Sequence, residues 1–259
     1  MTNIRVEKDA DGIVTLTWDM PGRSMNVLSE DSIAEYSKAA MDAIADPSVK
    51  GVVVTSGKPA FIAGADLSML EKQTSTASKA GVSEVERAKA VFDNLMEFNL
   101  ALRKIEKGGK PFVAAINGTA MGGGLEVCLA CHCRIVADDP KIQLALPESK
   151  VGLMPGAGGT QRLPRLLGAM TALPLILEGK SLDPQKALKA GLVHKVVQAS
   201  ELLTAAKAYI TGGGSAVQPW DTKEFKIPGG AVYGPVGKQV FVAGNSMVAA
   251  KTMRNYPAQ

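Results

Sequence analysis

The chain has 259 residues, of which 46% are hydrophobic and 21% charged, and a formal net charge of +4, which is typical of a soluble globular protein with one large domain or a domain plus an appendage. Aromatic residues make up only 5%, and the basic residues are scattered, which argues against a base-stacking surface or a nucleic-acid-binding tract. The amino terminus (MTNIRVEKDADG) lacks an apolar signal segment and no apolar run approaches the length of a membrane span, so we expect a cytoplasmic protein that binds neither membrane nor nucleic acid.

The first sixty-odd residues predict a hairpin, a helix and a buried strand. IRVEKD and GIVTLTWD alternate apolar and polar residues around the turn residues Ala10-Asp11-Gly12, which is typical of paired strands. Ser29 is expected to cap a helix over residues 30–44. The β-branched run GVVVTSG predicts a buried strand, and KPAFIAGADLSML a loop that leads into a short helix.

The central part of the chain alternates helices with short strands. A long amphipathic helix over residues 83–107 carries Val91, Leu95, Phe98 and Leu102 on one apolar stripe. Strands are expected at PFVAAING, CRIVADD, KIQLALPE and VHKVV, and helices over residues 159–167, 170–177, 183–190 and 202–210. This alternation predicts an α/β domain through about residue 210.

The carboxyl-terminal part has a different composition. Residues 211–235 are rich in Gly and Pro and predict an extended linker or cover, and residues 247–253 predict a brief closing helix. We therefore divide the chain into a domain over residues 1–210 and an extension over residues 211–259.

Three cysteines and two histidines give little sign of a metal site. Cys128, Cys131 and Cys133 beside His132 have the residue types of a metal cluster, but no second ligand cluster is present in the sequence. A buried helix leading into a strand, where cysteine acts as a small hydrophobic residue, explains them better. His132 and His194 lie near no nucleophile motif, so we expect both to be structural, and we expect no metal.

Three glycines precede the helical segment that holds Glu126. If the helix begins within Gly122–Gly124, the N–H of Gly123 lies in the first turn without an intrahelical partner and is free to bind developing negative charge. Glu126 follows three positions later on the same helical face. By itself this pattern also fits a first-turn glutamate that only stabilises the helix.

Two further segments favour a chemical role. The segment AFIAGADLSM places Ala65 at a second small-residue turn before a helix, so two N–H groups could point at one carbonyl oxygen. Glu148 follows a short strand and precedes the glycine cluster PGAGGT. Glu126 and Glu148 could then form a carboxylate pair around one water, as general acid–base catalysis needs.

Four motifs in order resemble the enoyl-CoA hydratase/isomerase (crotonase) family. They are FIAGADL, AAINGTAMGGGLEVCLAC, LPESKVGLMPGAGGTQRLPRLLG and ILEGKSLDPQKALKAGLVHKVV, and the resemblance extends from about Ile4 to Val197. It implies an α/β fold made of a crotonase-like spiral of ββα units with flanking helices. The expected activity is the hydration of trans-2-enoyl-CoA to 3-hydroxyacyl-CoA in fatty-acid β-oxidation, and the same carboxylates would allow Δ3–Δ2 enoyl-CoA isomerase activity.

Within the family, the chain is most similar to the amino-terminal hydratase domain of multifunctional β-oxidation α subunits. The stretch ACHCRIVADDPK between Glu126 and Glu148 and the ending MRNYPAQ carry this similarity. The resemblance implies that residues 211–259 would lead into a missing 3-hydroxyacyl-CoA dehydrogenase domain. It also implies a homo-oligomer or a β-oxidation complex with a thiolase subunit.

Residue roles follow from the resemblance position by position. The catalytic carboxylates would be Glu126 and Glu148, and the thioester oxygen would be held by the N–H groups of Ala65 and Gly123. Coenzyme A would be part of the substrate, and no separate cofactor is expected. The acyl-CoA contacts implied are Arg23, Met25, Val27, Ala63, Asp66, Leu67 and Gly122. Met25 and Val27 also fit simple core positions, and Arg23 a solvated loop charge. The alternative function is a catalytically silent acyl-CoA-binding or assembly domain of a truncated multifunctional enzyme.

Overall fold

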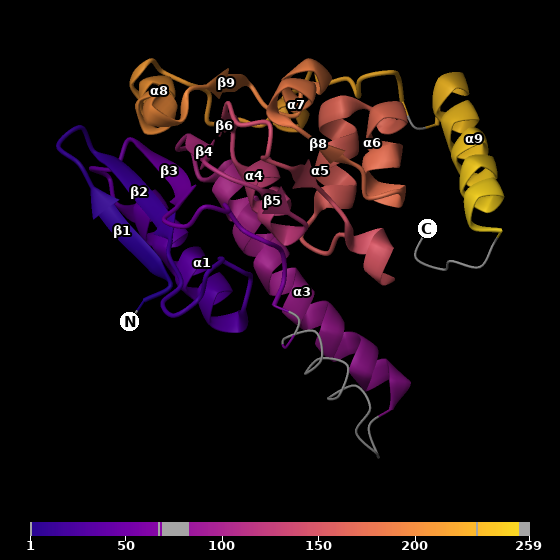
Figure 1. Cartoon of the computed structure of the whole chain (residues 1–259), viewed down its shortest axis with the longest axis horizontal. Coiled ribbons are helices and arrows are strands. Elements are labelled where there is room, and N and C mark those ends of the chain that lie inside the picture. The colour runs from indigo at the N-terminus through magenta and orange to yellow at the C-terminus, as the bar shows by residue number, and fades with distance from the viewer. Residues whose placement is uncertain (1, 67, 69–82, 232, 254–259) are drawn as a thin grey trace.

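A six-stranded sheet forms the centre of the computed structural model, which describes residues 2–66, 68, 83–231 and 233–253 (Figure 1). In spatial order its strands are β1 (Ile4–Lys8), β2 (Ile13–Trp18), β3 (Gly51–Ser56), β4 (Phe112–Ile116), β6 (Cys133–Ala137) and β9 (Lys195–Val197). β1 and β2 form the expected antiparallel hairpin, and each later neighbouring pair is parallel. β3, β4 and β6 are buried along their whole length, as parallel strands covered on both faces are. The α/β prediction is confirmed.

Helices α1 (Glu30–Ala45) and α8 (Leu202–Thr211) lie on opposite faces of the sheet, α1 against β1, β2 and β3 and α8 against β3, β4 and β6 (Figure 1). The hollow beside α1 is lined by Val14, whereas the hollow beside α8 is lined by Thr15 and Thr17, which point the other way in a strand. α1 begins at the expected cap, because the Ser29 side chain accepts a hydrogen bond from the N–H of Ser32.

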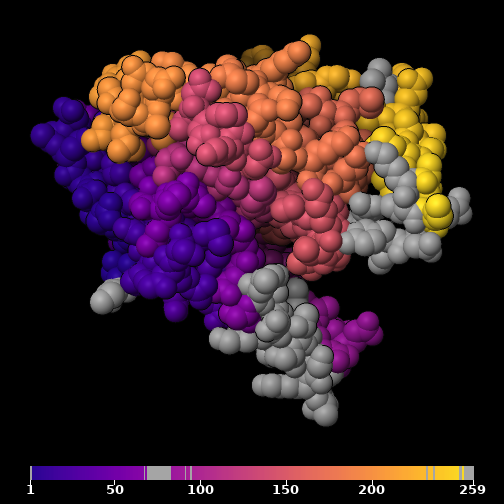
Figure 2. Space-filling view, in the orientation of Figure 1, coloured from indigo at the N-terminus to yellow at the C-terminus, as the bar shows by residue number. Residues whose placement is uncertain are grey.

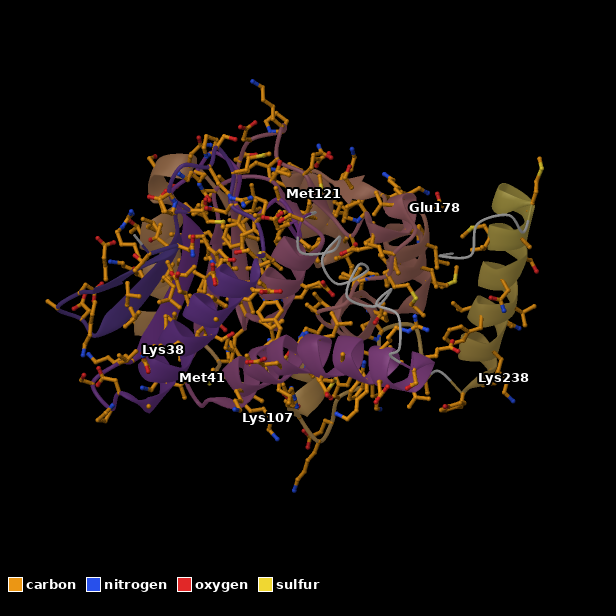
Figure 3. All side chains as sticks on the ribbon, turned by 90° about the horizontal axis from the view of Figure 1, so that it is seen from below. Lys38, Met41, Lys107, Met121, Glu178 and Lys238 are labelled. Carbon is orange, nitrogen blue, oxygen red and sulfur yellow. The ribbon has the colours of Figure 1, made fainter. Side chains whose placement is uncertain are left out.

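The long helix α3 (Glu84–Lys107) crosses from the edge of the molecule to its centre. Phe98 and Leu102 are buried as predicted, but Leu95 is 44% exposed, so its assignment to a buried stripe was wrong. The amino-terminal half of the helix projects from the body formed by the other coloured elements (Figures 1 and 2). Figure 3 shows its other end, at Lys107, near α1. The side chain of Val91 lies outside the described residues.

The remaining elements lie between β4 and the extension. They are β5 (Ala120–Met121), α4 (Gly123–Ala130), β7 (Leu144–Ala145), the 3-10 helix η1 (Glu148–Val151), α5 (Gly159–Leu167), α6 (Ala169–Leu177), β8 (Ser181–Leu182), α7 (Pro184–Ala190) and the 3-10 helix η2 (Ala199–Glu201). β5, β7 and β8 form a small second sheet. The helices predicted over residues 159–190 are confirmed within one residue at each end. The short helix expected after Asp66 lies largely outside the described residues.

The extension is partly packed and partly helical. It crosses the body through the 3-10 helix η3 (Pro219–Asp221), and the adjacent Gln218 is completely buried. The expected brief helix at residues 247–253 is wrong in length, because α9 covers Pro235–Thr252. Two internal glycines weaken the helical pattern in the sequence, but Gly244 lies against Leu173 of α6, and this packing stabilises the helix. Along the described ranges, no helix combines the length and hydrophobicity needed to cross a bilayer.

Candidate active site

Three loop segments are joined by backbone hydrogen bonds beside the parallel sheet. The N–H of Leu28 donates to Gly64 O (2.8 Å), and the N–H of Asp66 donates to Leu28 O (2.8 Å). The N–H of Met121 donates to Ile62 O (3.0 Å), which adds the turn before α4. The two small-residue turns noted in the sequence therefore lie side by side.

Asn26 fixes the first of these segments, a role that the sequence analysis missed. Its side chain is completely buried and its Oδ1 accepts from the N–H of Met20 (3.0 Å). Its Nδ2 donates to Trp18 O (2.9 Å) and Phe61 O (3.2 Å), so one amide side chain joins β2 to the loop that leads to Ala65. An asparagine inside an apolar loop is the signal that could have indicated this, since a buried amide must find partners.

The N–H groups of Ala65 and Gly123 follow the two adjacent turns. A Cβ built on Gly122 would stand 3.8 Å from the Cα of Gly64, which places the two turns in contact. Gly122 caps α4 with a φ of 52°, and Gly123 is the first helical residue, as predicted. Neither the Ala65 N–H nor the Gly123 N–H donates a hydrogen bond within the described part of the chain. Both donors are therefore available to an incoming oxygen.

Glu126 is held in the core by a second backbone turn. It is only 2% exposed, and its Oε1 accepts hydrogen bonds from the N–H groups of Ala157 (2.9 Å) and Gly159 (2.6 Å). Its other oxygen, Oε2, lies 3.9 Å from the place where a Cβ of Gly123 would stand. One oxygen is thus occupied by the turn, and the other faces the start of α4.

Burial raises the pKa of Glu126 to about 7. The hydrogen bonds from Gly159 and Ala157 act against this rise, the negative charge of Glu148 adds to it, and the positive charge of Arg162 opposes it. Glu126 can therefore change protonation state near neutral pH, as a general acid or base must.

Glu148 approaches the same glycines from η1. Its Oε1 lies 2.9 Å from the place where a Cβ of Gly122 would stand, and its buried Oε2 has no hydrogen-bond partner among the described residues. Burial raises the pKa of this carboxyl above its ordinary value. The two acids therefore each have an oxygen facing one of two consecutive residues of the glycine triple, next to the two unpaired N–H groups.

The far end of α4 is fixed by buried polar side chains. Arg134 Nη1 donates to Cys131 O (2.7 Å), and Gln218 Nε2 donates to Ala130 O (3.0 Å) and Cys131 O (3.1 Å). A cation and an amide donor at this end satisfy carbonyls that the helix leaves unpaired. The helix that carries Glu126 is thus held at both ends.

The residues implied for acyl-CoA contacts lie in the joined loops. Arg23 pairs with Asp66 through Nη2 and Oδ2 (2.8 Å), and the Arg23 side chain remains 49% exposed. Met25 is 50% exposed, which excludes the alternative that it is a core residue. The side chains of Val27 and Ala63 are half-buried, and Gly122 is buried at the turn. Leu67 lies outside the described residues.

The cysteines and histidines are structural neighbours of this site. Cys128, Cys131 and Cys133 are buried and free, and no cluster of three or more potential metal ligands occurs in the described ranges. His132 Nδ1 accepts from the N–H of Phe112 (3.0 Å), and its Nε2 lies 3.1 Å from Glu106 O. His194 Nδ1 accepts from the N–H of Arg134 (3.2 Å). Both rings serve the backbone, as predicted.

Two surface hollows, of about 370 and 490 Å³, lie elsewhere. The first lies between β1 and α1, and the second between the sheet and α8, and neither is lined by Glu126, Glu148, Ala65 or Gly123. The convergence of unpaired donors and raised carboxyl pKa values, and not the size of a hollow, identifies the candidate site.

Comparison with known proteins shows the family to which the chain is similar. Residues 8–212 match the model of the family described as enoyl-CoA hydratase/isomerase. The chain is 42% identical over 255 residues to the fatty acid oxidation complex subunit alpha of Shewanella frigidimarina, covering 96% of this chain and 33% of that protein. It is 46% identical over 198 residues to the protein of the same name from Idiomarina loihiensis, covering 76% and 26%. The chain thus spans about a third of the length of these relatives.

Among solved structures, the fold is similar to that of an enoyl-CoA hydratase from Bacillus anthracis. The TM-score is 0.68 at 32% identity, and the similarity covers 82% of this chain and 76% of that one. The crotonase-like fold that the sequence motifs imply is thereby confirmed.

Proposed function

Because the chain belongs to the enoyl-CoA hydratase/isomerase family, we propose that it hydrates trans-2-enoyl-CoA to 3-hydroxyacyl-CoA in fatty-acid β-oxidation. The observation that carries the proposal is the meeting of Glu126 and Glu148 on consecutive glycines, beside two unpaired backbone N–H groups. Fold alone would not be enough, since one fold supports many reactions.

The N–H groups of Ala65 and Gly123 are proposed to bind the thioester oxygen. Addition of water to C3 moves the double-bond electrons toward C2 and the thioester, so negative charge grows on that oxygen. Two donors already in place stabilise this charge without reorganisation, and a donor of this kind contributes about 10²–10³ in rate.

Glu126 is proposed to activate the water and Glu148 to deliver the proton to C2. The water oxygen bonds to C3 while its proton passes to the free Oε2 of Glu126, and the proton of Glu148 passes to C2. A pKa of about 7 suits a base at neutral pH, and burial raises the pKa of Glu148 above its ordinary value. Because the two acids interact, measured pKa values will belong to the pair.

Isomerase activity is proposed through the same carboxylates. Moving a double bond from C3 to C2 needs one group to remove a proton from C2 and one to return it at C4. Two buried acids with raised pKa values satisfy that need without water.

The acyl-CoA is proposed to lie along the loops that hold Arg23, Met25, Val27, Ala63, Asp66 and Gly122, with coenzyme A supplied as part of the substrate and no further cofactor. Exposed Met25 and the exposed side of the Arg23–Asp66 pair support this position. The printed name of the relatives, fatty acid oxidation complex subunit alpha, supports membership of a β-oxidation complex. A thiolase subunit as partner, a homo-oligomer and a cytoplasmic location are proposed on the resemblance alone. Residues 1–210 would form the hydratase domain and residues 211–259 an extension toward a dehydrogenase domain.

The test is the loss of conjugated enoyl-thioester absorbance with crotonyl-CoA and with a longer 2-enoyl-CoA. Glu126→Gln and Glu148→Gln should each lower kcat by about 10²–10⁴, because each removes one proton-transfer group while keeping its size. Glu224→Gln, at an exposed position of the extension, is the matched control and should leave the rate unchanged.

Isomerase activity is followed separately with trans-3-enoyl-CoA. If the unmodified protein binds enoyl-CoA but turns over no better than the two glutamine variants, the domain is a silent acyl-CoA-binding or assembly domain and the proposal fails.

A further inference from the structure

The turn over residues 155–159 lies between Glu126 and helix α3, and it forms hydrogen bonds on both sides. We propose that Arg162, held by Glu106, is a positioning residue that fixes this turn and thereby the Glu126 carboxylate. The kinetic part of this inference rests on the proposed function, whereas its structural part does not.

On the inner side, the turn contacts the catalytic candidate directly. The N–H groups of Ala157 and Gly159 both donate to Oε1 of Glu126. They are the only donors to this carboxylate in the described part of the chain. The orientation of Oε2 toward Gly123 therefore depends on where the turn is placed.

On the outer side, the same turn is bound by a buried ion pair. Arg162 Nη1 donates to Ala157 O (2.8 Å), and Arg162 Nε donates to Glu106 Oε1 (2.6 Å). Arg162 is 6% exposed and Glu106 only 2%. Ala157 thus accepts from the arginine through its carbonyl and donates to Glu126 through its amide, so one peptide segment links the two side chains.

Position 158, between the two residues whose N–H groups bind Glu126, must be glycine for a steric reason. Gly158 has a φ of 92°, and a Cβ built on it would overlap Nη1 of Arg162 and approach Asn99 Oδ1 to 3.2 Å. The turn is therefore shaped to let Arg162 reach Ala157.

Helix α3 provides the support behind Arg162. Asn99, Arg103 and Glu106 are spaced four and three residues apart, so they share one helical face. Asn99 Nδ2 donates to Gly156 O (2.7 Å), and Arg103 Nη1 donates to Glu106 Oε2 (2.8 Å). Arg103 also pairs with Asp221 of the extension. The turn is consequently attached to α3 at two points.

A buried ion pair is weak evidence for stability, because desolvation of both charges offsets their attraction. Apolar residues in place of Glu106 and Arg162 would remove the desolvation cost, but they could not donate to the carbonyl of Ala157. The charged groups that face Glu126 are Glu148 from η1 and Arg162 from α5. Arg162 thus acts on the orientation of Glu126 and on its charge together.

Kinetics of three variants test the proposal. Arg162→Met removes one of the two cations that pair with the buried Glu106 and leaves it only Arg103 among the described residues, so the double variant Glu106→Leu/Arg162→Met, which removes both members of the buried pair, guards against misfolding. Both should lower kcat by about 10–100-fold with KM within about twofold, because a displacement near 1 Å is enough to spoil alignment. Arg165→Met, on the exposed side of the same helix, is the matched control and should retain full activity.

Carbon-13 NMR of the Glu126 carboxyl, assigned with Glu126→Gln, gives a readout that needs no substrate. In the double variant and in Arg162→Met, its pKa should rise by about one unit, since loosened amide donors and a lost cation both disfavour the charged form. The acid limb of the pH–rate profile should move upward by the same amount.

If the double variant keeps the kcat and the Glu126 titration of the unmodified protein, Arg162 is not a positioning residue. If neither the unmodified protein nor any variant hydrates an enoyl-CoA, yet the pKa of Glu126 shifts as stated, the proposed function fails and the positioning role stands.

Discussion

The chain contains two runs of three glycines, and they serve different purposes. Gly122–Gly124 begin α4 inside the candidate site, whereas Gly212–Gly214 follow α8 at the surface. A run of glycines is therefore informative only together with what surrounds it in space. In the first run a side chain would meet the core or a catalytic candidate, and in the second it would meet the carbonyl of Ala208, solvent or the ring of Tyr209.

In the first run each glycine is required for its own reason. Gly122 has positive φ and touches Glu148, a Cβ on Gly123 would overlap Leu28, and one on Gly124 would overlap the backbone carbonyl of Ile62. Gly124 allows a close approach of backbone to backbone and Gly122 a close approach to a functional group, whereas Gly123 leaves room for the side chain of Leu28.

In the second run the glycines end a helix. Gly212 caps α8, and the N–H groups of Gly213 and Gly214 donate to Ile210 O (3.2 Å) and Tyr209 O (2.9 Å). Gly213 needs its φ of 77°, but a Cβ there would meet nothing within 4 Å. This is the role that glycine commonly has after a helix.

The largest effect on stability is expected for Gly124→Ala. The added methyl group would overlap the carbonyl of Ile62, so the loop that holds Ile62 and helix α4 must move apart, at a cost of about 3 kcal/mol in the free energy of unfolding. Urea denaturation monitored by circular dichroism measures it. If Gly124→Ala lowers the free energy of unfolding by less than Gly213→Ala does, the two glycine runs do not differ as described.

Glu126→Gln is expected to stabilise the protein at high pH. The folded-state pKa of about 7 lies above the ordinary value of 4.5, so stability from the protonated carboxyl is present below pH 4.5 and is lost as the pH rises through about 7. Glutamine cannot ionise, and the variant should be more stable by about 3 kcal/mol near pH 8.5.

Denaturation at several pH values measures this difference. The variant and the unmodified protein should have similar stabilities near about pH 4.5, and a constant difference at all pH values would contradict the assigned burial of the carboxyl.

Gly122→Ala should affect catalysis more than folding. The methyl group would press on Oε1 of Glu148 and strain a φ of 52°, so we expect about a 100-fold fall in kcat for crotonyl-CoA hydration. Gly213→Ala, also at positive φ, serves as the control and should keep full activity. Equal activity of the two variants would show that Gly122 has no influence on catalysis.

The smallest effect is expected for Gly213→Ala, at about 1 kcal/mol of unfolding free energy, which reflects only the left-handed backbone. Gly213→Asn should cost less, since asparagine tolerates this conformation better than alanine does. Thermal unfolding of the two variants side by side checks the order, and the reverse order would show that packing, not backbone strain, controls this turn.

Much of the fold could be predicted from local patterns. The hairpin, the Ser29 cap and α5 follow from alternation, capping residues and helical periodicity, which act over a few neighbouring positions. Leu95 and α9 could not be predicted in this way. The exposure of Leu95 depends on how far α3 projects from the body, and the length of α9 depends on its packing against α6.

The residues of the candidate site were likewise predicted from the sequence only in part. The sequence indicated Glu126, Glu148, Ala65 and Gly123 as residue types in suitable turns, with motifs resembling a known family. It gave no role to Asn26, Glu106 or Arg162, because the partners that explain them include distant ones: Phe61 lies 35 positions from Asn26, and Glu106 lies 56 positions from Arg162.

By itself, then, the sequence determined which segments form strands and helices, since backbone preferences and apolar periodicity are local. Only the tertiary structure decided that one oxygen of Glu126 is bound while the other is free, and that the two acids meet on consecutive glycines. Burial, and with it a carboxyl pKa near 7, arises from the packing of distant elements, which no local pattern contains.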